Sequence, residues 1–281
     1  MSPIDLMTRD GQQLAATLHA PAGERRGGVV VIGATGVAQR FYRRFAQALS
    51  TSGLEVLTFD LRGIGASRRG TLRGFECGFR HWAELDADAA VEFMLARGPT
   101  AVVGHSFGGH AFGQLSRPND TLGLYTVATG AAWSGYMPAT ERLKVETMWK
   151  VLGPVTTRVA GFLPGPVWGG EDLPLGVYRD WKRWSHMPRY FFDDPSMDAE
   201  AKFARVRVPI HGVTAEDDLW APPTSMRVFL SQYRAAPVTL EVHQPTALGV
   251  GQLGHMGHFR AEALPAFVPQ VTRWLDERLA A

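Results

Sequence analysis

Apolar residues are spaced along the chain in two alternating ways, one typical of buried strands and one typical of amphipathic helices. Residues 27–32 form an unbroken run of Gly, Val and Ile, which predicts a strand buried on both faces. Residues 41–52 instead repeat apolar positions every three or four residues and stop at Gly53, which predicts a helix. The same patterns predict further strands at 4–8, 13–19, 56–59, 100–103, 122–127, 208–213 and 238–243, and helices at 82–95, 107–115, 224–233 and 268–279.

The order of these elements predicts an α/β architecture with an insertion. The first two strands are joined by Asp10-Gly11, a dipeptide typical of hairpin turns. Beyond them strands and helices alternate, which indicates a mostly parallel sheet with helices on both faces. The alternation lapses at 132–202, where five of the eight tryptophans lie and no strand is predicted. We therefore expect a core formed by residues 1–131 and 203–281, and a helical cap (lid) formed by residues 132–202.

Composition and charge narrow the classes of partner. The chain has 281 residues, of which 45% are hydrophobic, which is enough for one large core and too many for a disordered chain. Its 29 Lys and Arg residues nearly balance 27 Asp and Glu residues, and the arginines are scattered rather than gathered in one stripe. This pattern argues against a nucleic-acid partner. The longest apolar stretch is far shorter than the roughly 20 residues that span a membrane, so no membrane partner is expected.

Two further features bear on location. The first ten residues lack a charged head followed by an apolar run, so no signal peptide is expected. Cys77 is the single cysteine and cannot form an internal disulfide, which favours a reducing, cytoplasmic location. We expect a small-molecule substrate, and the sequence is also compatible with a homo-oligomer.

The strongest chemical signal is the pentapeptide Gly104-His105-Ser106-Phe107-Gly108. It has the pattern Gly-x-Ser-x-Gly, follows a predicted strand and opens a predicted helix. In this context the serine lies on a strained turn that pushes its Oγ out of the sheet. The residues two positions away must be small, because the strand and helix backbones nearly touch there. Ser106 is therefore the candidate nucleophile, and the alternative is a glycine-rich turn with an incidental serine.

A nucleophilic serine needs a base, and the base needs a carboxylate that orients it. The loop after the penultimate predicted strand carries Glu216, Asp217 and Asp218. The region after the last strand carries His255 and His258. Three carboxylates therefore compete for the role of acid and two histidines for the role of base. We favour Asp218, and we expect Asp217 to cap a turn.

Acyl transfer also needs two backbone N–H groups that bind the developing oxyanion. One is expected from Phe107, the residue after the nucleophile. The other is expected from Gly33-Ala34-Thr35-Gly36 after the third strand, where we favour Thr35. Because the backbone nitrogen makes the contact, side-chain identity leaves Ala34 open.

With these motifs the chain resembles the α/β-hydrolase superfamily over about residues 4–280. Residues 59–67 match the Asp-x-Arg-Gly-x-Gly-x-Ser segment of that superfamily, which is usually structural. The chain is more narrowly similar to a group of bacterial serine α/β hydrolases with a helical cap, through its patterns at 33–37, 82–86, 170–174 and 254–257. One departure is that the loop at 33–36 lacks the common His-Gly pair, which we interpret as a subgroup trait. The resemblance implies the α/β-hydrolase fold.

The resemblance also implies a role for each candidate. Ser106 attacks a carbonyl carbon, and His255 takes the proton of the Ser106 hydroxyl. His255 matches the subgroup pattern Gly-His-x-Gly. Asp218 stands four residues before Pro222, where the superfamily usually has its acid. An aromatic residue is common in the subgroup at the position of His258, which suggests a ring that packs beside the site. The expected activity is the hydrolysis of a carboxylic ester.

The aromatic residues of the cap suggest a small to medium apolar substrate. Trp149, Trp168 and Trp184 are the candidate substrate-binding residues, and the alternative is that they pack the cap's own core. The same catalytic residues would also serve acyl transfer to another acceptor, lactone or amide hydrolysis, or cofactor-free perhydrolysis. A catalytically inactive binding protein on the same fold is the alternative of another class.

Two other kinds of site share some of these residues. Residues 30–36 resemble the phosphate-binding turn of Rossmann reductases, and Tyr178 and Lys182 match their Tyr-x-x-x-Lys pair. The third glycine of that fingerprint would fall at Gln39, however, which argues against it. His255 and His258 have a spacing that suits zinc, but no further ligand cluster accompanies them. We therefore expect no cofactor and no metal.

Overall fold

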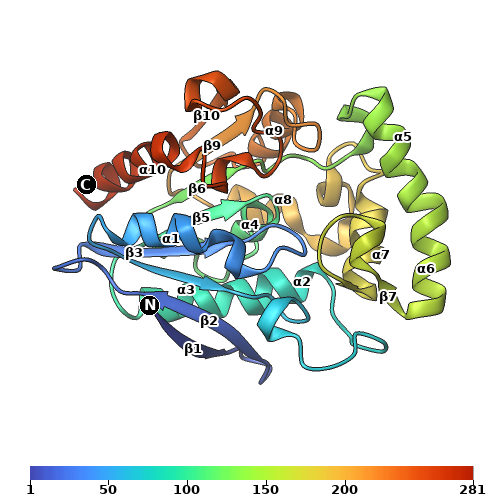
Figure 1. Cartoon of the computed structure of the whole chain (residues 1–281), viewed down its shortest axis with the longest axis horizontal. Helices are drawn as coiled ribbons and strands as arrows, with labels where there is room; N and C mark the ends of the chain where they lie inside the picture. The colour runs from blue at the N-terminus through green and yellow to red at the C-terminus, as the bar shows by residue number, and fades with distance from the viewer. Residues whose placement is uncertain (281) are drawn as a thin grey trace.

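The computed structural model describes residues 1–280 and contains one large sheet with helices on both sides (Figure 1). Its strands are β1 (Ser2–Met7), β2 (Gln13–His19), β3 (Gly27–Ile32), β4 (Leu54–Phe59), β5 (Thr100–His105), β6 (Leu124–Val127), β9 (Ile210–Ala215) and β10 (Val238–His243). They lie in the order β1-β2-β4-β3-β5-β6-β9-β10. β2 runs antiparallel to β1 and β4, and the other neighbouring strands run parallel.

Two groups of helices cover the two faces of the sheet. α1 (Arg43–Ser50) and α10 (Leu264–Leu279) pack on one face. α3 (Asp88–Leu95), α4 (Phe107–Phe112) and α9 (Pro223–Leu230) pack on the other. Within residues 1–280, no helix combines the length and the apolar character needed to cross a membrane.

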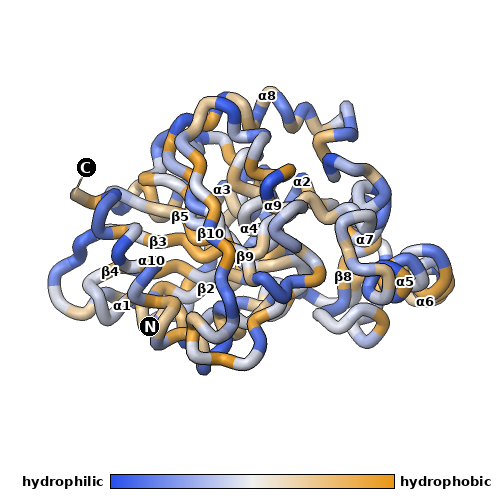
Figure 2. Tube along the Cα trace, turned by 90° about the horizontal axis from the view of Figure 1, so that it is seen from above, coloured by the Kyte–Doolittle hydropathy of each residue, from blue (hydrophilic) through white to orange (hydrophobic). Residues whose placement is uncertain are grey.

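β3 shows why the central strands are apolar without interruption. Successive side chains of a strand point to opposite faces. Val29 and Val31 belong to the core beneath α1 and α10, whereas Val30 and Ile32 belong to the core beneath α3 and α4. Figure 2 shows these central strands as hydrophobic segments inside the molecule. The mostly parallel sheet covered on both faces confirms the predicted α/β fold class.

Some helices differ from the prediction at their ends. The helix predicted at 82–95 begins earlier, as α2 (Phe79–His81), and passes through a π-helical turn at Trp82–Ala87 before α3. The helix predicted at 41–52 is divided into a 3-10 turn at Gln39–Tyr42 and α1. Apolar spacing cannot distinguish these local windings, because one extra or missing residue in a turn shifts the pattern only slightly.

The segment 132–202 gathers at one end of the sheet (Figure 1). It contains α5 (Ala139–Thr147), α6 (Gly153–Ala160) and α7 (Leu175–Trp184). α8 (Ala199–Ala204) crosses the expected boundary at residue 202. Together with short 3-10 and π-helical turns, these helices form most of this segment, which we call the cap.

The prediction that the cap contains no strand is wrong. β7 (Phe162–Leu163) and β8 (Leu173–Pro174) pair antiparallel and form a separate two-stranded sheet. Each strand has two residues, so neither is long enough to show the alternation that identifies strands in a sequence.

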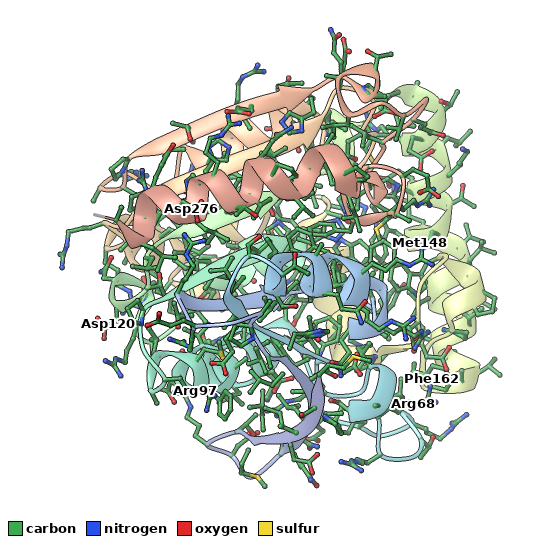
Figure 3. The ribbon with its side chains drawn as sticks, turned by 60° about the vertical axis from the view of Figure 1, so that its left-hand side comes forward. Arg68, Arg97, Asp120, Met148, Phe162 and Asp276 are labelled. Atoms are coloured by element: carbon green, nitrogen blue, oxygen red, sulfur yellow. The ribbon has the colours of Figure 1, made fainter. Side chains whose placement is uncertain are left out.

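Charged and aromatic contacts fasten the cap to the core. Arg68 Nη1 lies 2.8 Å from Asp172 Oδ2. The same guanidinium lies 5.8 Å from the ring centre of Phe162, and Figure 3 shows the two residues close together. The Glu171 N–H donates to the Gly36 carbonyl at 3.0 Å. The cap loop that carries Glu171 and Asp172 is thereby fixed against the turn after β3.

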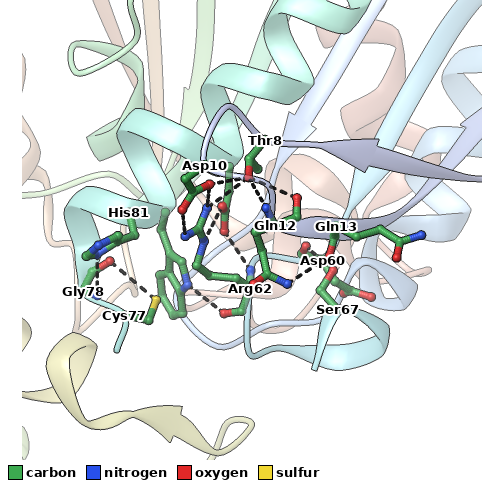
Figure 4. Close-up of polar contacts among 12 residues, drawn as sticks. Thr8, Asp10, Gln12, Gln13, Asp60, Arg62, Ser67, Cys77, Gly78 and His81 are labelled. Atoms are coloured by element: carbon green, nitrogen blue, oxygen red, sulfur yellow. Dashed lines mark hydrogen bonds and ion pairs between the residues drawn. The ribbon is translucent and has the colours of Figure 1, made fainter. Parts of the chain in front are cut away.

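Arg62, in the Asp-x-Arg-Gly segment after β4, forms a buried polar network (Figure 4). Its Nε donates to Asp86 Oδ1 at 2.6 Å, and its Nη1 donates to Asp10 Oδ2 at 2.6 Å. Trp82 Nε1 donates to the Arg62 carbonyl at 3.0 Å. These contacts join the β1–β2 hairpin, the turn after β4 and the π-helical turn before α3, so the segment stabilises the fold.

Candidate active site

Ser106 lies on a strained turn between β5 and α4. Its φ is 51° and its ψ is −105°, a combination that few residues other than glycine adopt. Its N–H donates to the Val127 carbonyl at 2.8 Å, and its carbonyl accepts from the Gly109 N–H at 3.0 Å. Such strain persists only where the surrounding structure holds it, and it is concentrated at functional sites. Ser106 also lines a cavity beneath the cap.

The two glycines of the motif are required by close backbone contact. A Cβ added to Gly108 would lie 2.1 Å from the carbonyl oxygen of Ile32. A Cβ added to Gly104 would lie 2.6 Å from the carbonyl carbon of Gly108. Real Cβ atoms cannot approach backbone atoms so closely, so the turn that holds Ser106 depends on glycine at both positions.

His255 and Asp218 form a hydrogen-bonded pair. His255 Nδ1 lies 2.9 Å from Asp218 Oδ2. Asp218 Oδ1 also accepts from the N–H groups of Trp220, at 2.8 Å, and Ala221, at 2.9 Å. Burial acts to raise the pKa of Asp218, but His255 and the two N–H groups outweigh burial and lower that pKa below its usual value. Asp218 is therefore a buried carboxylate that orients the imidazole of His255.

Ser106 and His255 line the same cavity. Among residues 1–280, no hydrogen bond joins Ser106 Oγ to His255 Nε2. Hydrogen bonds between catalytic groups are often long without substrate and tighten only when it binds. The arrangement thus brings together the predicted nucleophile, base and acid, although the hydrogen bond between Ser106 and His255 is not formed.

The other two candidate carboxylates, Asp217 and Glu216, do not contact His255 in the way that Asp218 does. Asp217 Oδ2 accepts from the Leu253 N–H at 3.0 Å, and its Oδ1 accepts from the Gly254 N–H at 2.8 Å. The carboxylate of Asp217 therefore fixes the loop that carries His255. Glu216 is exposed to solvent.

His258 lies outside the cavity wall. It is fully buried, and its Nε2 lies 3.2 Å from His243 Nδ1. Burial, assisted by His243, lowers the pKa of His258 to about 3. Its ring centre lies 5.1 Å from that of Phe267, so it packs as an aromatic side chain beside α10.

The two candidate N–H groups of the turn after β3 differ in their partners. Ala34 and Thr35 both line the cavity. The Ala34 N–H already donates to the hydroxyl of Tyr42 at 2.8 Å, whereas the Thr35 N–H makes no hydrogen bond within residues 1–280. The Phe107 N–H lies at the start of α4, where a helix offers no acceptor of its own. The geometry therefore favours Thr35 and Phe107 as oxyanion donors.

The cavity beside Ser106 is small and has one aromatic wall. Its volume is about 240 Å³. Trp168, Trp181, Tyr190 and Trp220 form the aromatic wall. Small residues complete the lining, among them Ala34, Ala128, Gly130, Ala132, Gly169 and Gly170.

The three tryptophans expected to bind substrate have different locations. Trp168 lines the cavity. Trp149 is fully buried with its ring centre 5.0 Å from that of Trp181, and Trp184 is fully buried with its Nε1 donating to Asp194 Oδ2 at 2.7 Å. Neither is part of the cavity wall. This corrects the expectation for Trp149 and Trp184, which pack the interior of the cap behind the residues that face the cavity.

Three residues of the wall, Trp181, Tyr190 and Trp220, are not among those expected to bind substrate. Trp220 follows Asp218 by two positions, so its place in the loop that must reach the nucleophile is a usable signal. Tyr190 has a φ of 59°, a strained value for a bulky residue. No sequence pattern predicts this backbone conformation, because the packing around Tyr190 imposes it.

The residues of the two alternative sites have other partners. Among residues 1–280, no group of three or more His, Cys, Asp or Glu side chains could hold a metal ion. His255 contacts Asp218, whereas His258 contacts His243. Tyr178, on α7, donates its hydroxyl to the Trp149 carbonyl at 3.4 Å and does not line the cavity.

Solved structures with similar folds include several hydrolases. A soluble variant of monoglyceride lipase from Saccharomyces cerevisiae, in complex with a substrate analogue, has a TM-score of 0.72 and 17% identity, over 99% of this chain and 96% of that one. The proline iminopeptidase of Mycobacterium smegmatis has a TM-score of 0.63 and 16% identity, over 99% of both chains. The esterase domain of a Rhodothermus marinus protein has a TM-score of 0.59 and 17% identity, over 97% of this chain and 96% of that one. At these identities the similarity concerns the fold.

The sequence itself establishes the family. No curated protein sequence matches the chain. Residues 27–266, which include every candidate catalytic residue, match the family described as the alpha/beta hydrolase family. This match agrees with the eight-stranded sheet and with Ser106 on the strained turn after β5. The chain belongs to the alpha/beta hydrolase family.

Proposed function

We propose that the protein is a serine hydrolase that cleaves a carboxylic ester through an acyl-enzyme intermediate. One observation carries the proposal: the cavity that contains the strained Ser106 also contains His255, whose Nδ1 lies 2.9 Å from the carboxylate of Asp218. Acyl transfer requires a nucleophile and a base within reach of the substrate, and a carboxylate that orients the base. Ser106 and His255 line the cavity, and Asp218 lies buried behind His255.

Each group has one task in this mechanism. Ser106 Oγ attacks the ester carbonyl carbon while His255 Nε2 takes its proton, and Asp218 stabilises the imidazolium that forms. The N–H groups of Thr35 and Phe107 bind the negative charge on the carbonyl oxygen, a contribution that typically changes the rate by ~10²–10³ per donor. His255 then protonates the leaving alcohol, and water cleaves the acyl-enzyme by the same route.

The cavity volume supports a small apolar acyl group. A cavity of about 150 Å³ accommodates a benzene ring. The volume of about 240 Å³ therefore suits a single ring or a short branched chain. The aromatic wall formed by Trp168, Trp181, Tyr190 and Trp220 favours such an apolar group over a charged one.

A groove outside the cavity provides an exit path for the leaving alcohol. This groove has a volume of about 810 Å³ and shares four residues with the inner cavity: Val37, Gly169, Gly170 and Met256. Met256 follows His255, the residue that must protonate the leaving alcohol. The acyl group thus occupies the inner cavity, and the alcohol departs through the groove.

Replacement of the nucleophile tests the proposal. Ser106→Ala should abolish hydrolysis of a short activated ester and labelling by a fluorophosphonate probe, with little change in thermal stability. Ser231→Ala is the matched control, because Ser231 is exposed and its hydroxyl contacts the Val228 carbonyl and Gln232 Nε2 rather than the cavity. Full labelling of Ser106→Ala would refute the mechanism. A wild-type protein that neither labels nor hydrolyses any ester would instead support an inactive binding protein.

A further inference from the structure

We propose that Tyr42 and His105 are positioning residues, which use a chain of buried hydrogen bonds to hold the oxyanion turn, the nucleophile turn and the base loop in mutual register. This inference rests on the proposed function, because it assigns catalytic importance to the distances among those three segments. Neither residue lines the cavity, so both act through their neighbours.

The chain of contacts is continuous from one segment to the next. The Ala34 N–H donates to the Tyr42 hydroxyl at 2.8 Å. The Tyr42 hydroxyl oxygen lies 2.8 Å from His105 Nδ1. His105 Nε2 lies 2.9 Å from the carbonyl oxygen of His255. Both linking side chains are fully buried, at 1% and 0% exposure, so water does not compete for these contacts.

With His105 neutral, only one assignment of protons satisfies every contact. The His255 carbonyl can only accept, so His105 Nε2 must carry the hydrogen and donate. His105 Nδ1 is then an acceptor, and the Tyr42 hydroxyl donates to it while accepting from the Ala34 N–H. Burial lowers the pKa of His105 to about 3 and raises the pKa of Tyr42 above its usual value. Both side chains therefore stay neutral near neutral pH, and the direction of the chain is fixed.

The ends of the chain adjoin the reacting groups. Ala34 precedes Thr35, whose N–H is a proposed oxyanion donor, and His105 precedes Ser106. His255 is the proposed base itself. Catalytic groups must be held within about 0.5 Å of their productive positions. In the part of the chain that the structure describes, the turn after β3 and the His255 loop are not joined by backbone hydrogen bonds between strands. The hydrogen bonds through Tyr42 and His105 connect all three segments and provide that precision.

The position of His105 follows from the alternation of β5. Ala101 and Val103 point to the face covered by α1 and α10, so His105 points to the same face. There its ring centre lies 5.8 Å from that of Tyr42 and 4.8 Å from that of Phe259. The residue before the nucleophile is thereby directed away from the cavity and toward the loops that it links.

Steady-state kinetics of single and double variants test the role. Tyr42→Phe removes the middle hydroxyl, and we expect kcat for a short ester to fall about 10- to 100-fold, the range for partners that orient catalytic ligands, with KM changed less than about twofold. His105→Leu should lower kcat at least as much. Tyr42→Phe should then have little further effect in the His105→Leu background, because the chain is already broken.

Two variants separate positioning from general stability. Tyr125→Phe is the matched control, because its buried hydroxyl belongs to the same core and has no hydrogen-bond partner among residues 1–280, and we expect an unchanged kcat. His105→Gln can still donate to the His255 carbonyl, so it should retain about tenfold more activity than His105→Leu at similar thermal stability.

Each outcome gives a decision. If Tyr42→Phe and His105→Leu keep kcat within about twofold of wild type while Ser106→Ala is inactive, the positioning role is refuted and the proposed function stands. Equal losses in His105→Gln and His105→Leu that follow thermal stability would also refute it. An active Ser106→Ala would refute the proposed function instead.

Discussion

His255 Nδ1 lies 2.9 Å from Asp218 Oδ2, although 37 positions separate the two residues along the chain. The contact forms because β9 and β10 run parallel, so the loops after both strands emerge at the same edge of the sheet. Asp217, next in the chain to Asp218, accepts from the N–H groups of Leu253 and Gly254 and holds the second loop against the first. Neighbouring carboxylates thus have separate tasks, one toward the imidazole and one toward the backbone.

Four single variants should distinguish these tasks. Asp218→Asn should lower kcat by ~10⁴, since the amide no longer stabilises the correct tautomer and the imidazolium. His255→Ala should lower kcat by several orders of magnitude, because no base is left to take the proton of Ser106. Asp217→Asn and His258→Ala should cost about tenfold or less, because these residues touch the base only through its loop or lie behind it. An inactive His258→Ala beside an active His255→Ala would reverse the assignment of the base.

Gly108→Ala should destroy the nucleophile turn. Its Cβ would lie 2.1 Å from the Ile32 carbonyl oxygen, so the backbone of α4 would have to move away from β3. We expect loss of phosphonate labelling at Ser106 together with a marked drop in Tm. Gly251→Ala is the control, because within residues 1–280 its added Cβ would meet no heavy atom within 4 Å apart from its chain neighbours, and it should label like wild type. Normal labelling of Gly108→Ala would show that the turn tolerates a side chain.

Trp168→Ala should change the preference for acyl chain length. Removing an indole from the wall enlarges the cavity of about 240 Å³, so kcat/KM for a longer acyl ester should rise about tenfold relative to the acetate ester. Trp149→Phe is the control, because Trp149 is buried in the cap and does not line the cavity. That variant should lose stability but keep the wild-type preference. An unchanged preference in Trp168→Ala would show that acyl groups do not bind against this wall.

The protein should lose stability in acid partly because of His258. Burial, assisted by His243, lowers the pKa of His258 to about 3 in the fold, from a usual value of 6.5. The unfolded chain therefore binds one more proton at this position between these two values. The free energy of unfolding should fall as the pH falls through that window, by up to about 1.4 kcal/mol per pH unit.

His258→Phe isolates this contribution. The phenyl ring can keep the contact with Phe267 but cannot take up a proton. Urea unfolding between about pH 6 and about pH 4 should show a shallower decline for the variant than for wild type, by about one proton. Equal slopes would mean that His258 is protonated equally in the folded and unfolded chains.

Local sequence determined most of the fold. The apolar run of β3 required burial on both faces, and the helices α1 and α3 had the spacing needed to supply it. Gly104 and Gly108, on either side of Ser106, predicted the strained turn, because only glycine permits the close contact between backbone segments there. The strands β7 and β8 were not predictable, since two residues carry no period.

The sequence by itself determined which residue types could perform the chemistry: one serine in the turn motif, three carboxylates and two histidines. Tertiary structure decided among them, placing Asp218 rather than Asp217 on His255 and giving the Ala34 N–H to Tyr42 rather than to the cavity. It also decided that Trp168 faces the cavity while Trp149 and Trp184 do not. The physical reason is that neighbouring residues of a loop share composition and spacing, whereas the direction of each side chain is set by segments distant in the sequence that pack against it.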